Sequence, residues 1–198
     1  MPAAVKKFIE AFSNLPSIGP RQATRLAYHL VALPRAEMIE IAKSLVELAK
    51  TKRCKKCFFL HDNLGEQCYF CEDASRDKDI IMIIERETDL MTIEKTGEYR
   101  GVYFIVGEMK KSGVLDEDKK IRLNVLKEKI IHELGGVARE IILAIAPTAY
   151  GDFNANLLKM ELEPLTRKIT RLGRGIPTGG EIEFADEATL ISAMKNRG

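Results

Sequence analysis

Four cysteines within one short stretch constrain this chain more than any other feature of its sequence. The stretch KRCKKCFFLHDNLGEQCYFC, residues 52–71, contains all of them: Cys54, Cys57, Cys68 and Cys71. They form two CxxC pairs separated by ten residues, and two such turns supply the four thiolates of a tetrahedral zinc site. Because four protein ligands leave no open coordination position, the sequence predicts one structural zinc ion per chain and not a catalytic one.

A dithiol redox centre is the alternative use of these cysteines, but it would need only one CxxC pair. His61 lies between the two pairs. Because the predicted ligand shell is already full, we expect it to be a loop residue and not a ligand. The segment has little apolar sequence of its own, so we expect metal binding to substitute for hydrophobic burial there.

The N-terminal pattern and the apolar runs of the chain predict a cytoplasmic protein without membrane contact. The opening residues MPAAVKKFIEAFSNL are amphipathic and lack the apolar core of a secretory signal. No apolar run reaches the roughly 18 residues of a membrane helix. In the reducing cytoplasm, two closely spaced CxxC turns hold a metal more readily than they form disulfides.

Positive charge is concentrated near the N-terminus, although the net charge is only +2. Residues 1–57 contain eleven Lys or Arg and four acidic residues. A local basic surplus on a near-neutral protein indicates contact with a polyanion, and a solvated charged face is the common alternative. The first CxxC pair is surrounded by four basic residues, which would either reach phosphates or only solvate the turn: Lys52, Arg53, Lys55 and Lys56.

The stretch LPSIGPRQATRLAYHL, residues 15–30, is typical of two helices joined by a tight turn. A glycine in such a turn, here Gly19, lets backbone amides at the next helix N-terminus approach a phosphate. Arg21 and Arg25 are four residues apart and therefore share one helix face. The stretch resembles a helix-hairpin-helix motif, which contacts DNA phosphates without reading the base sequence. An ordinary helical hairpin is the alternative.

Apolar spacing predicts one helix before the hairpin turn, from residue 3 to 15, and a third helix over 36–50. We expect the third helix to bury one apolar side, formed by Met38, Ile41, Leu45 and Leu48. Together these helices would make residues 1–53 a helical DNA-binding region.

From residue 79 the sequence changes to alternating strand and helix patterns. DIIMIIE, GVYFIVG and EIILAIA are continuous apolar runs that begin at residues 79, 101 and 140. They are typical of buried parallel strands, although periodicity alone does not distinguish them from buried helices. The alternation predicts βαβ units and a parallel sheet between helices. Further elements are expected as helices at 89–95, 123–134 and 152–161 and as a fourth strand near 168–172.

The C-terminal tail begins as a glycine-rich loop and continues with EIEF, a short strand pattern at 181–184, and a last helix after Asp186. We expect Asp186 and Glu187 to cap that helix and to interact with its dipole. The complete prediction is an α/β protein in four parts: a helical region, a zinc element, a parallel-sheet domain, and a strand and helix tail. Their expected bounds are 1–53, 54–78, 79–165 and 166–198.

Glu85 directly follows the first predicted strand, at the edge where open parallel sheets place their sites. Asp152 follows the third predicted strand, and the two carboxylates together suggest Mg²⁺-assisted phosphoryl transfer. Two carboxylates are few ligands for two metal ions. The chain also lacks a GxxxxGK[ST] phosphate loop, so no robust ATPase activity is expected.

The chain resembles the RecR family of bacterial recombination mediators over essentially its whole length. The resemblance rests on the hairpin, the four cysteines, the glutamate after the first strand, and the stretches TGEYRGVYFIVG and TRLGRGIPTGGEIEFADEATL, in this order. It implies a Toprim-type fold for 79–165, a ring-like homotetramer that encloses DNA, and association with the nucleoid. It also implies cooperation with RecO- or RecF-type proteins in loading a recombinase onto gapped DNA.

For single residues, we expect DNA contacts from Gly19, Arg21 and Arg25 in the hairpin, where the last two match basic positions of the family. Beside the zinc turn, we expect DNA contacts from Lys55 and Lys56.

The resemblance makes Glu85 the Toprim glutamate and, with Asp152, part of a partner-binding surface. RecR proteins usually carry Glu-Gly-Glu where this chain has Tyr150, Gly151 and Asp152, and this departure weakens a hydrolytic role. The stretch MKKSGVLDEDKK, residues 109–120, is shorter than its counterpart in the family. We therefore expect a modified partner surface.

The leading hypothesis is a sequence-independent DNA-binding mediator that is not an enzyme. The alternative is a Mg²⁺-dependent Toprim nuclease or topoisomerase-like enzyme that uses Glu85 and Asp152. A third hypothesis is a zinc-ribbon adaptor that binds only protein. Arg171 and Arg174, next to flexible glycines, are expected to face DNA or a neighbouring subunit.

Overall fold

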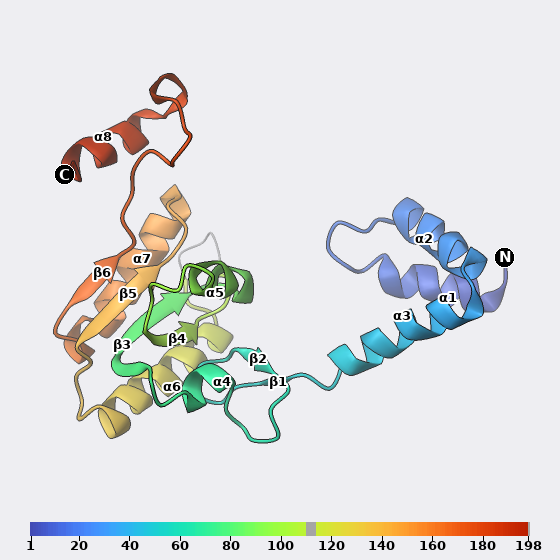
Figure 1. The fold of residues 1–198 in the computed structure, drawn as a ribbon, viewed down its shortest axis with the longest axis horizontal. Coiled ribbons are helices and arrows are strands. Elements are labelled where there is room, and N and C mark those ends of the chain that lie inside the picture. Colours follow the sequence, from blue (N-terminus) through green and yellow to red (C-terminus); the bar gives the residue numbers. More distant parts are fainter. Residues whose placement is uncertain (110–113, 198) are drawn as a thin grey trace. The chain divides into compact units, whose positions relative to one another are not determined.

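The computed structural model describes residues 1–109 and 114–197 of the chain (Figure 1). These residues form two compact units, Met1–Thr51 and Lys52–Gly198. Within the described ranges, no helix is both long enough and apolar enough to cross a membrane.

The N-terminal unit consists of three helices, as the sequence predicts. Pro20 begins the second helix, a position that suits its missing N–H and its fixed φ. The turn before it contains Ser17 in the left-handed conformation, with φ 64°. Ala23 and Ala27 are the buried residues of this helix, and small side chains allow close packing of neighbouring helices. The helices are α1 (Ala3–Phe12), α2 (Pro20–Ala32) and α3 (Arg35–Leu48).

The prediction that α3 buries its apolar side is wrong within this unit. The four side chains that define that side, Met38, Ile41, Leu45 and Leu48, are 39–67% exposed. An open groove of about 730 Å³ is instead lined by apolar residues of α1, α2 and α3, which include Met38, Ile41 and Leu45 but not Leu48. Three short helices leave this groove uncovered, because an amphipathic pattern states which face is apolar but not whether anything covers it.

The larger unit is built around a four-stranded parallel sheet, and the predicted βαβ arrangement is confirmed. Its strand order is β4-β3-β5-β6, so the first strand of the sheet has a neighbour on each side. The strands are β3 (Asp77–Ile84), β4 (Gly101–Ile105), β5 (Glu140–Ala144) and β6 (Ile169–Arg171). The helices that connect them are α5 (Glu87–Glu94), α6 (Glu117–Glu133) and α7 (Ala149–Leu162).

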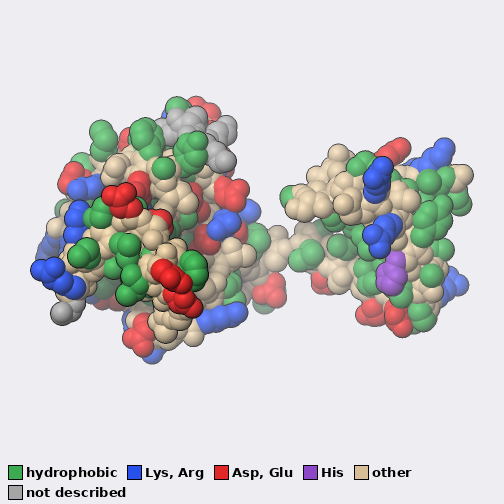
Figure 2. Space-filling view, turned by 90° about the horizontal axis from the view of Figure 1, so that it is seen from above, with side chains coloured by type: hydrophobic (Ala, Val, Ile, Leu, Met, Phe, Trp, Pro, Cys, Tyr) green, Lys and Arg blue, Asp and Glu red, His purple; other side chains and the backbone are tan. Residues whose placement is uncertain are grey.

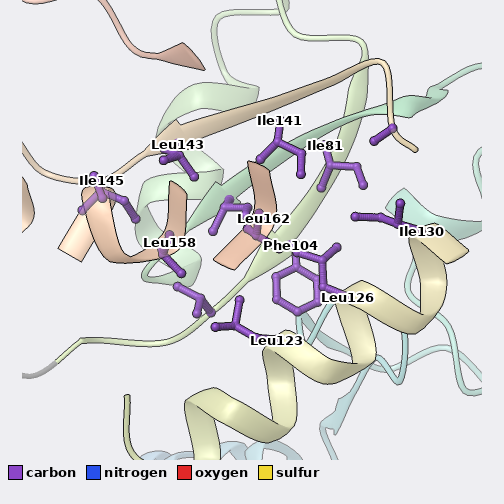
Figure 3. Packing of buried hydrophobic residues seen from close by; sticks show 14 of the residues in the cluster. Ile81, Phe104, Leu123, Leu126, Ile130, Ile141, Leu143, Ile145, Leu158 and Leu162 are labelled. Carbon is purple, nitrogen blue, oxygen red and sulfur yellow. The ribbon is translucent and has the colours of Figure 1, made fainter. Parts of the chain in front are cut away.

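Each strand sends alternate side chains into two cores, as the two-residue period of a strand requires. In β3, Ile81 and Ile83 belong to the core on one face, and Met82 and Ile84 belong to the core on the other. The first core contains apolar residues of α6 and α7 (Figure 3). The second contains Leu90 of α5 together with residues of the cysteine segment.

The cysteine segment is therefore part of the larger unit. It contains β1 (Lys52–Arg53), β2 (Leu60–His61) and the short α4 (Tyr69–Glu72), and β1 pairs with β2 in an antiparallel ribbon. Phe59 and Phe70 join the second core. The amide of Ile105 donates a hydrogen bond of 2.9 Å to the carbonyl of Cys57, which connects the segment to β4.

The C-terminal tail contains a short 3₁₀ turn, Glu163–Leu165, before β6 and ends in α8 (Glu187–Lys195). The strand expected at EIEF is wrong, because Ile182–Phe184 form a second 3₁₀ turn. The described residues offer this segment no partner strand, and a strand needs a ladder of hydrogen bonds to persist. The predicted cap is confirmed, because the Asp186 carboxylate accepts a hydrogen bond of 2.9 Å from the amide of Thr189.

Candidate metal centre and nucleic-acid interface

The four cysteines converge on one point, as their spacing predicts. Their sulfur atoms all lie within 4.8 Å of one another. The Sγ atoms of Cys54 and Cys71 are 3.7 Å apart, and those of Cys57 and Cys68 are 3.4 Å apart. A tetrahedral zinc ion with bonds of about 2.3 Å to sulfur separates its ligands by roughly 3.8 Å. The cluster therefore fits a four-thiolate metal centre of this kind.

Backbone hydrogen bonds hold the two CxxC turns in place. The amide of Phe58 donates to the carbonyl of Cys54 at 2.9 Å, and the amide of Cys71 donates to that of Cys68 at 3.0 Å. Phe58 adopts the left-handed conformation at φ 65°, and its ring packs at the edge of both cores. A non-glycine residue with positive φ is uncommon. Its apolar contacts hold the backbone in this shape.

The thiols also shift one another's pKa values. Hydrogen bonding with Cys57 lowers the pKa of Cys54, while hydrogen bonding with Cys54 raises the pKa of Cys57. Without a metal ion, one thiol of such a pair therefore keeps its proton while the other loses it more readily. A bound cation that takes four thiolates removes this competition.

His61 is placed differently from the loop position that its sequence suggests. It ends β2 with only 3% of its surface exposed. Neither ring nitrogen has a hydrogen-bond partner among the described residues. Only the four cysteines form a candidate ligand group in that part of the chain, so the structure gives no support for His61 as a ligand.

The hairpin residues Arg21 and Arg25 lie on the exposed surface of α2, and no acidic side chain of the described chain pairs with either of them. Gly19 is the N-cap residue and has no side chain to accept a hydrogen bond from the first amides of the helix. Those amides and the positive end of the helix dipole are available to an anion.

The basic residues of the cysteine segment are in a different situation. Lys55 pairs with Glu66 at 2.5 Å, and Lys56 pairs with Glu133 at 2.8 Å. Arg53 is likewise paired, with a carboxylate of α5. Exposed pairs of this type contribute only about 0–1 kcal/mol. Phosphates would nevertheless have to displace them.

One residue of the hairpin surface was missed in the sequence. His29 follows Arg25 by four residues, as Arg25 follows Arg21, so all three lie within about 80° around the helix. His29 and Arg25 line the same shallow depression. In Figure 2, Lys or Arg side chains lie next to a His side chain on the surface of the N-terminal unit. The four-residue spacing was the signal that could have found it.

Glu85 lies at the carboxyl end of β3, where the sequence predicts it. Its Oε1 accepts a hydrogen bond of 3.3 Å from the amide of Met109. It lines a pocket of about 490 Å³ together with Glu108, Tyr150 and Gly151. The next four residues of the altered loop, 110–113, lie outside the described residues.

Asp152 does not line the pocket of Glu85. Its carboxylate pairs instead with two arginines: Arg171, the last residue of β6, at 2.9 Å, and Arg174, just after β6, at 3.0 Å. Arg174, with a further contribution from Arg171, lowers the pKa of Asp152 to about 2. The expectation that these arginines face DNA or another subunit stays a prediction, and the structure adds that both are paired within the chain.

Gly151 explains one feature of the motif around Asp152. A Cβ atom on this residue would lie 1.9 Å from the carbonyl oxygen of Ala146. The amide of Gly151 also donates a hydrogen bond of 3.0 Å to Thr148, the N-cap of α7. Only glycine allows this close approach.

Comparison with protein-family models finds three matches in chain order. Residues 5–49 match the RecR helix-hairpin-helix model, residues 79–173 match a Toprim domain, and residues 175–197 match the RecR C-terminal model.

Curated relatives match the chain along nearly its full length. The Recombination protein RecR of Clostridium perfringens is 37% identical over 99% of this chain and 96% of its own length. The proteins of the same name from Rubrobacter xylanophilus and Heliobacterium modesticaldum are 38% and 39% identical over 98% of this chain. These alignments cover 96% and 95% of the two relatives.

Proposed function

This chain belongs to the RecR family of recombination proteins, and from that premise we propose that it is a DNA-binding mediator of recombinational repair that catalyses no reaction. In this proposal it acts at the nucleoid with RecO- or RecF-type partners and helps to load a recombinase onto gapped DNA. The single observation that carries the proposal is the unpaired, exposed pair Arg21 and Arg25 beside the uncapped N-terminus of α2.

These groups suit phosphate contacts that do not depend on base sequence. Two guanidinium groups on one helix face can reach neighbouring phosphates, and the backbone amides after Gly19 can donate hydrogen bonds to a further phosphate. Because such binding releases counterions from DNA, its affinity should fall steeply as salt rises.

The test is a titration of gapped and duplex DNA at several salt concentrations. We expect the slope of log affinity against log salt to fall in magnitude by about 0.9 for each phosphate contact that is lost. Arg21→Ala with Arg25→Ala should therefore lower the slope by roughly 2. A slope that is the same for wild type and double variant would contradict the hairpin as the contact surface.

Lys55 and Lys56 provide a matched comparison of equal charge. If they also contact DNA, Lys55→Ala with Lys56→Ala should lower the slope. The loss of affinity should be smaller than in the double arginine variant, because phosphates have to displace existing ion pairs at these positions. An unchanged slope would remove the zinc element from the proposed interface.

We propose zinc as the resident metal, held by all four cysteines in a structural role. The support is the separation of the sulfur atoms and the absence of a position for substrate in a four-thiolate shell. Elemental analysis of the purified protein should give one zinc per chain.

We further propose that the chain assembles into a homotetrameric ring. The support is the uncovered groove of the N-terminal unit, because soluble proteins rarely leave a large apolar surface open. Leu45 lines the groove, whereas Leu48 on the same helix does not. Leu45→Glu should therefore reduce the solution mass, and Leu48→Glu should not.

The nuclease alternative has less support than the mediator. Asp152 is neutralised by two arginines, and the described residues contain no group of three acidic side chains placed to hold a metal. Incubation of supercoiled DNA with pure protein and Mg²⁺ tests this point. Cleavage by the wild-type protein that is abolished in Glu85→Gln would contradict the mediator proposal and support the nuclease.

A further inference from the structure

A second pocket of the larger unit carries charges that neither DNA binding nor the metal centre uses. It has a volume of about 340 Å³ and lies where β3, β5 and β6 end. Three arginines line it: Arg86, Arg171 and Arg174. The carboxyl ends of parallel strands are the edge at which open α/β sheets bind ligands. We call this site the arginine pocket.

The positive charge that is free for a ligand lies on one side of the arginine pocket. Arg171 and Arg174 share the single carboxylate of Asp152, which leaves one cation there. Arg86 pairs with Asp89 at 3.2 Å and lies 3.9 Å from Glu108. Glu85 also acts on Arg86, so the charge of Arg86 is already matched.

The remainder of the lining is apolar. Ala144 and Ile145 are buried at the end of β5, and Ile93 comes from α5. Leu172 lies between the arginines in sequence, with half of its side chain exposed. A ligand that fills this site combines a carboxylate for the arginines with an apolar group for the lining.

We propose that the arginine pocket binds an acidic peptide segment of a partner protein, with an apolar side chain in the pocket and neighbouring carboxylates on Arg171 and Arg174. One excess charge at Arg171 and Arg174 favours this ligand over DNA, which needs a row of cations along its backbone. In this proposal the pocket binds its partner through positive charge, whereas the family resemblance implies an acidic partner-binding surface that includes Asp152.

Asp152 has a defined role in this proposal: it competes with the peptide for the two arginines. Asp152→Asn removes the competitor and should tighten peptide binding several-fold. Arg171→Gln with Arg174→Gln removes the receptor groups and should weaken binding about tenfold or more. A residue that only maintained the fold would not give opposite signs for the two partners of one ion pair.

The experiment uses the full-length protein and a fluorescently labelled ten-residue peptide of alternating Glu and Leu, followed by anisotropy at low salt. A peptide with Gln in place of Glu should bind at least tenfold more weakly. Arg167→Gln is the matched control, because this exposed arginine precedes β6 at the opposite edge of the sheet and should leave affinity unchanged. Leu172→Asp tests the same site without breaking an ion pair, and it should weaken binding.

Four outcomes would overturn the proposal. The first is no measurable binding of the acidic peptide to the wild-type protein. The second is a loss of affinity in Asp152→Asn that parallels the loss in the arginine variant. The third is a loss in Arg167→Gln as large as that in the double variant Arg171→Gln with Arg174→Gln, which would indicate general surface attraction. The fourth is displacement of the peptide by duplex DNA from a protein that carries Arg21→Ala and Arg25→Ala, which would make the pocket a nucleic-acid site.

Discussion

The two units of this protein treat their charged and apolar groups in opposite ways. The larger unit buries its apolar side chains in two cores that cover both faces of the sheet. Its four thiols face one another, and the charges of Lys55 and Lys56 are paired with acidic side chains. The N-terminal unit leaves a groove uncovered and two arginines unpaired. A count of basic residues therefore does not locate a binding surface, because a basic side chain is available to a ligand only where the chain itself has not already neutralised its charge.

The largest expected effect is that of metal removal, which should destabilise the larger unit and leave the stability of the N-terminal unit unchanged. A structural metal contributes several kcal/mol or more to the domain that it holds. We expect a strong chelator, or Cys57→Ser, to expose amides of residues 52–109 to hydrogen exchange while residues 3–48 keep their protection. Mass spectrometry of peptides from the full-length protein measures both in one sample. Equal loss of protection in both units would contradict a metal ion that stabilises only the larger unit.

Core substitutions should show the same contrast at a smaller scale. Leu126 is fully buried in α6, and Leu126→Ala should cost about 2–5 kcal/mol of unfolding free energy. Leu48, at the end of α3, is 67% exposed, so Leu48→Ala should cost less than about 0.5 kcal/mol. Urea denaturation measures both. A large cost at Leu48 would indicate that another surface covers it in solution.

His29 sharpens the description of the open surface. If it extends the line of Arg21 and Arg25, His29→Ala should weaken DNA binding by a few-fold, and His29→Lys should steepen the salt slope by about 0.9. His132→Ala is the control, because this exposed histidine lies in the last turn of α6 in the other unit. Equal losses for the two alanine variants would show that the position on α2 is not special.

The smallest effect concerns the most strongly paired carboxylate. Because the folded pKa of Asp152 is lowered from 3.8 to about 2, its pairing stabilises the fold above pH 3.8 and the contribution disappears as pH falls towards 2. The side chain is 42% exposed, so the contribution is screened to below about 1 kcal/mol. Asp152→Asn should therefore be slightly less stable at pH 7 and equal to wild type near pH 2. A gap that is constant with pH would indicate a packing effect.

The elements that the sequence identifies correctly are those whose signal is local. The run DIIMIIE predicts β3 because a short continuous apolar run is typical of a strand covered on both faces, and the CxxC spacing itself brings thiols together. The burial of α3 and the strand at EIEF were wrong, because both depend on a surface or a partner strand that no local pattern reveals. The partners of Asp152 are 19 and 22 residues away in the chain. Their pairing comes from the meeting of α7 with the end of β6.

The hydrogen bond from Ile105 to Cys57 also bears on the tendency of the protein to aggregate. β4 is an outer strand of the sheet, and an outer strand with free amides recruits strands of other molecules. The cysteine turn shields the end of that strand only while it keeps its shape. A sample stripped of its ion should therefore tend to precipitate through sheet-to-sheet contact between molecules, so storage without chelators should prolong its shelf life.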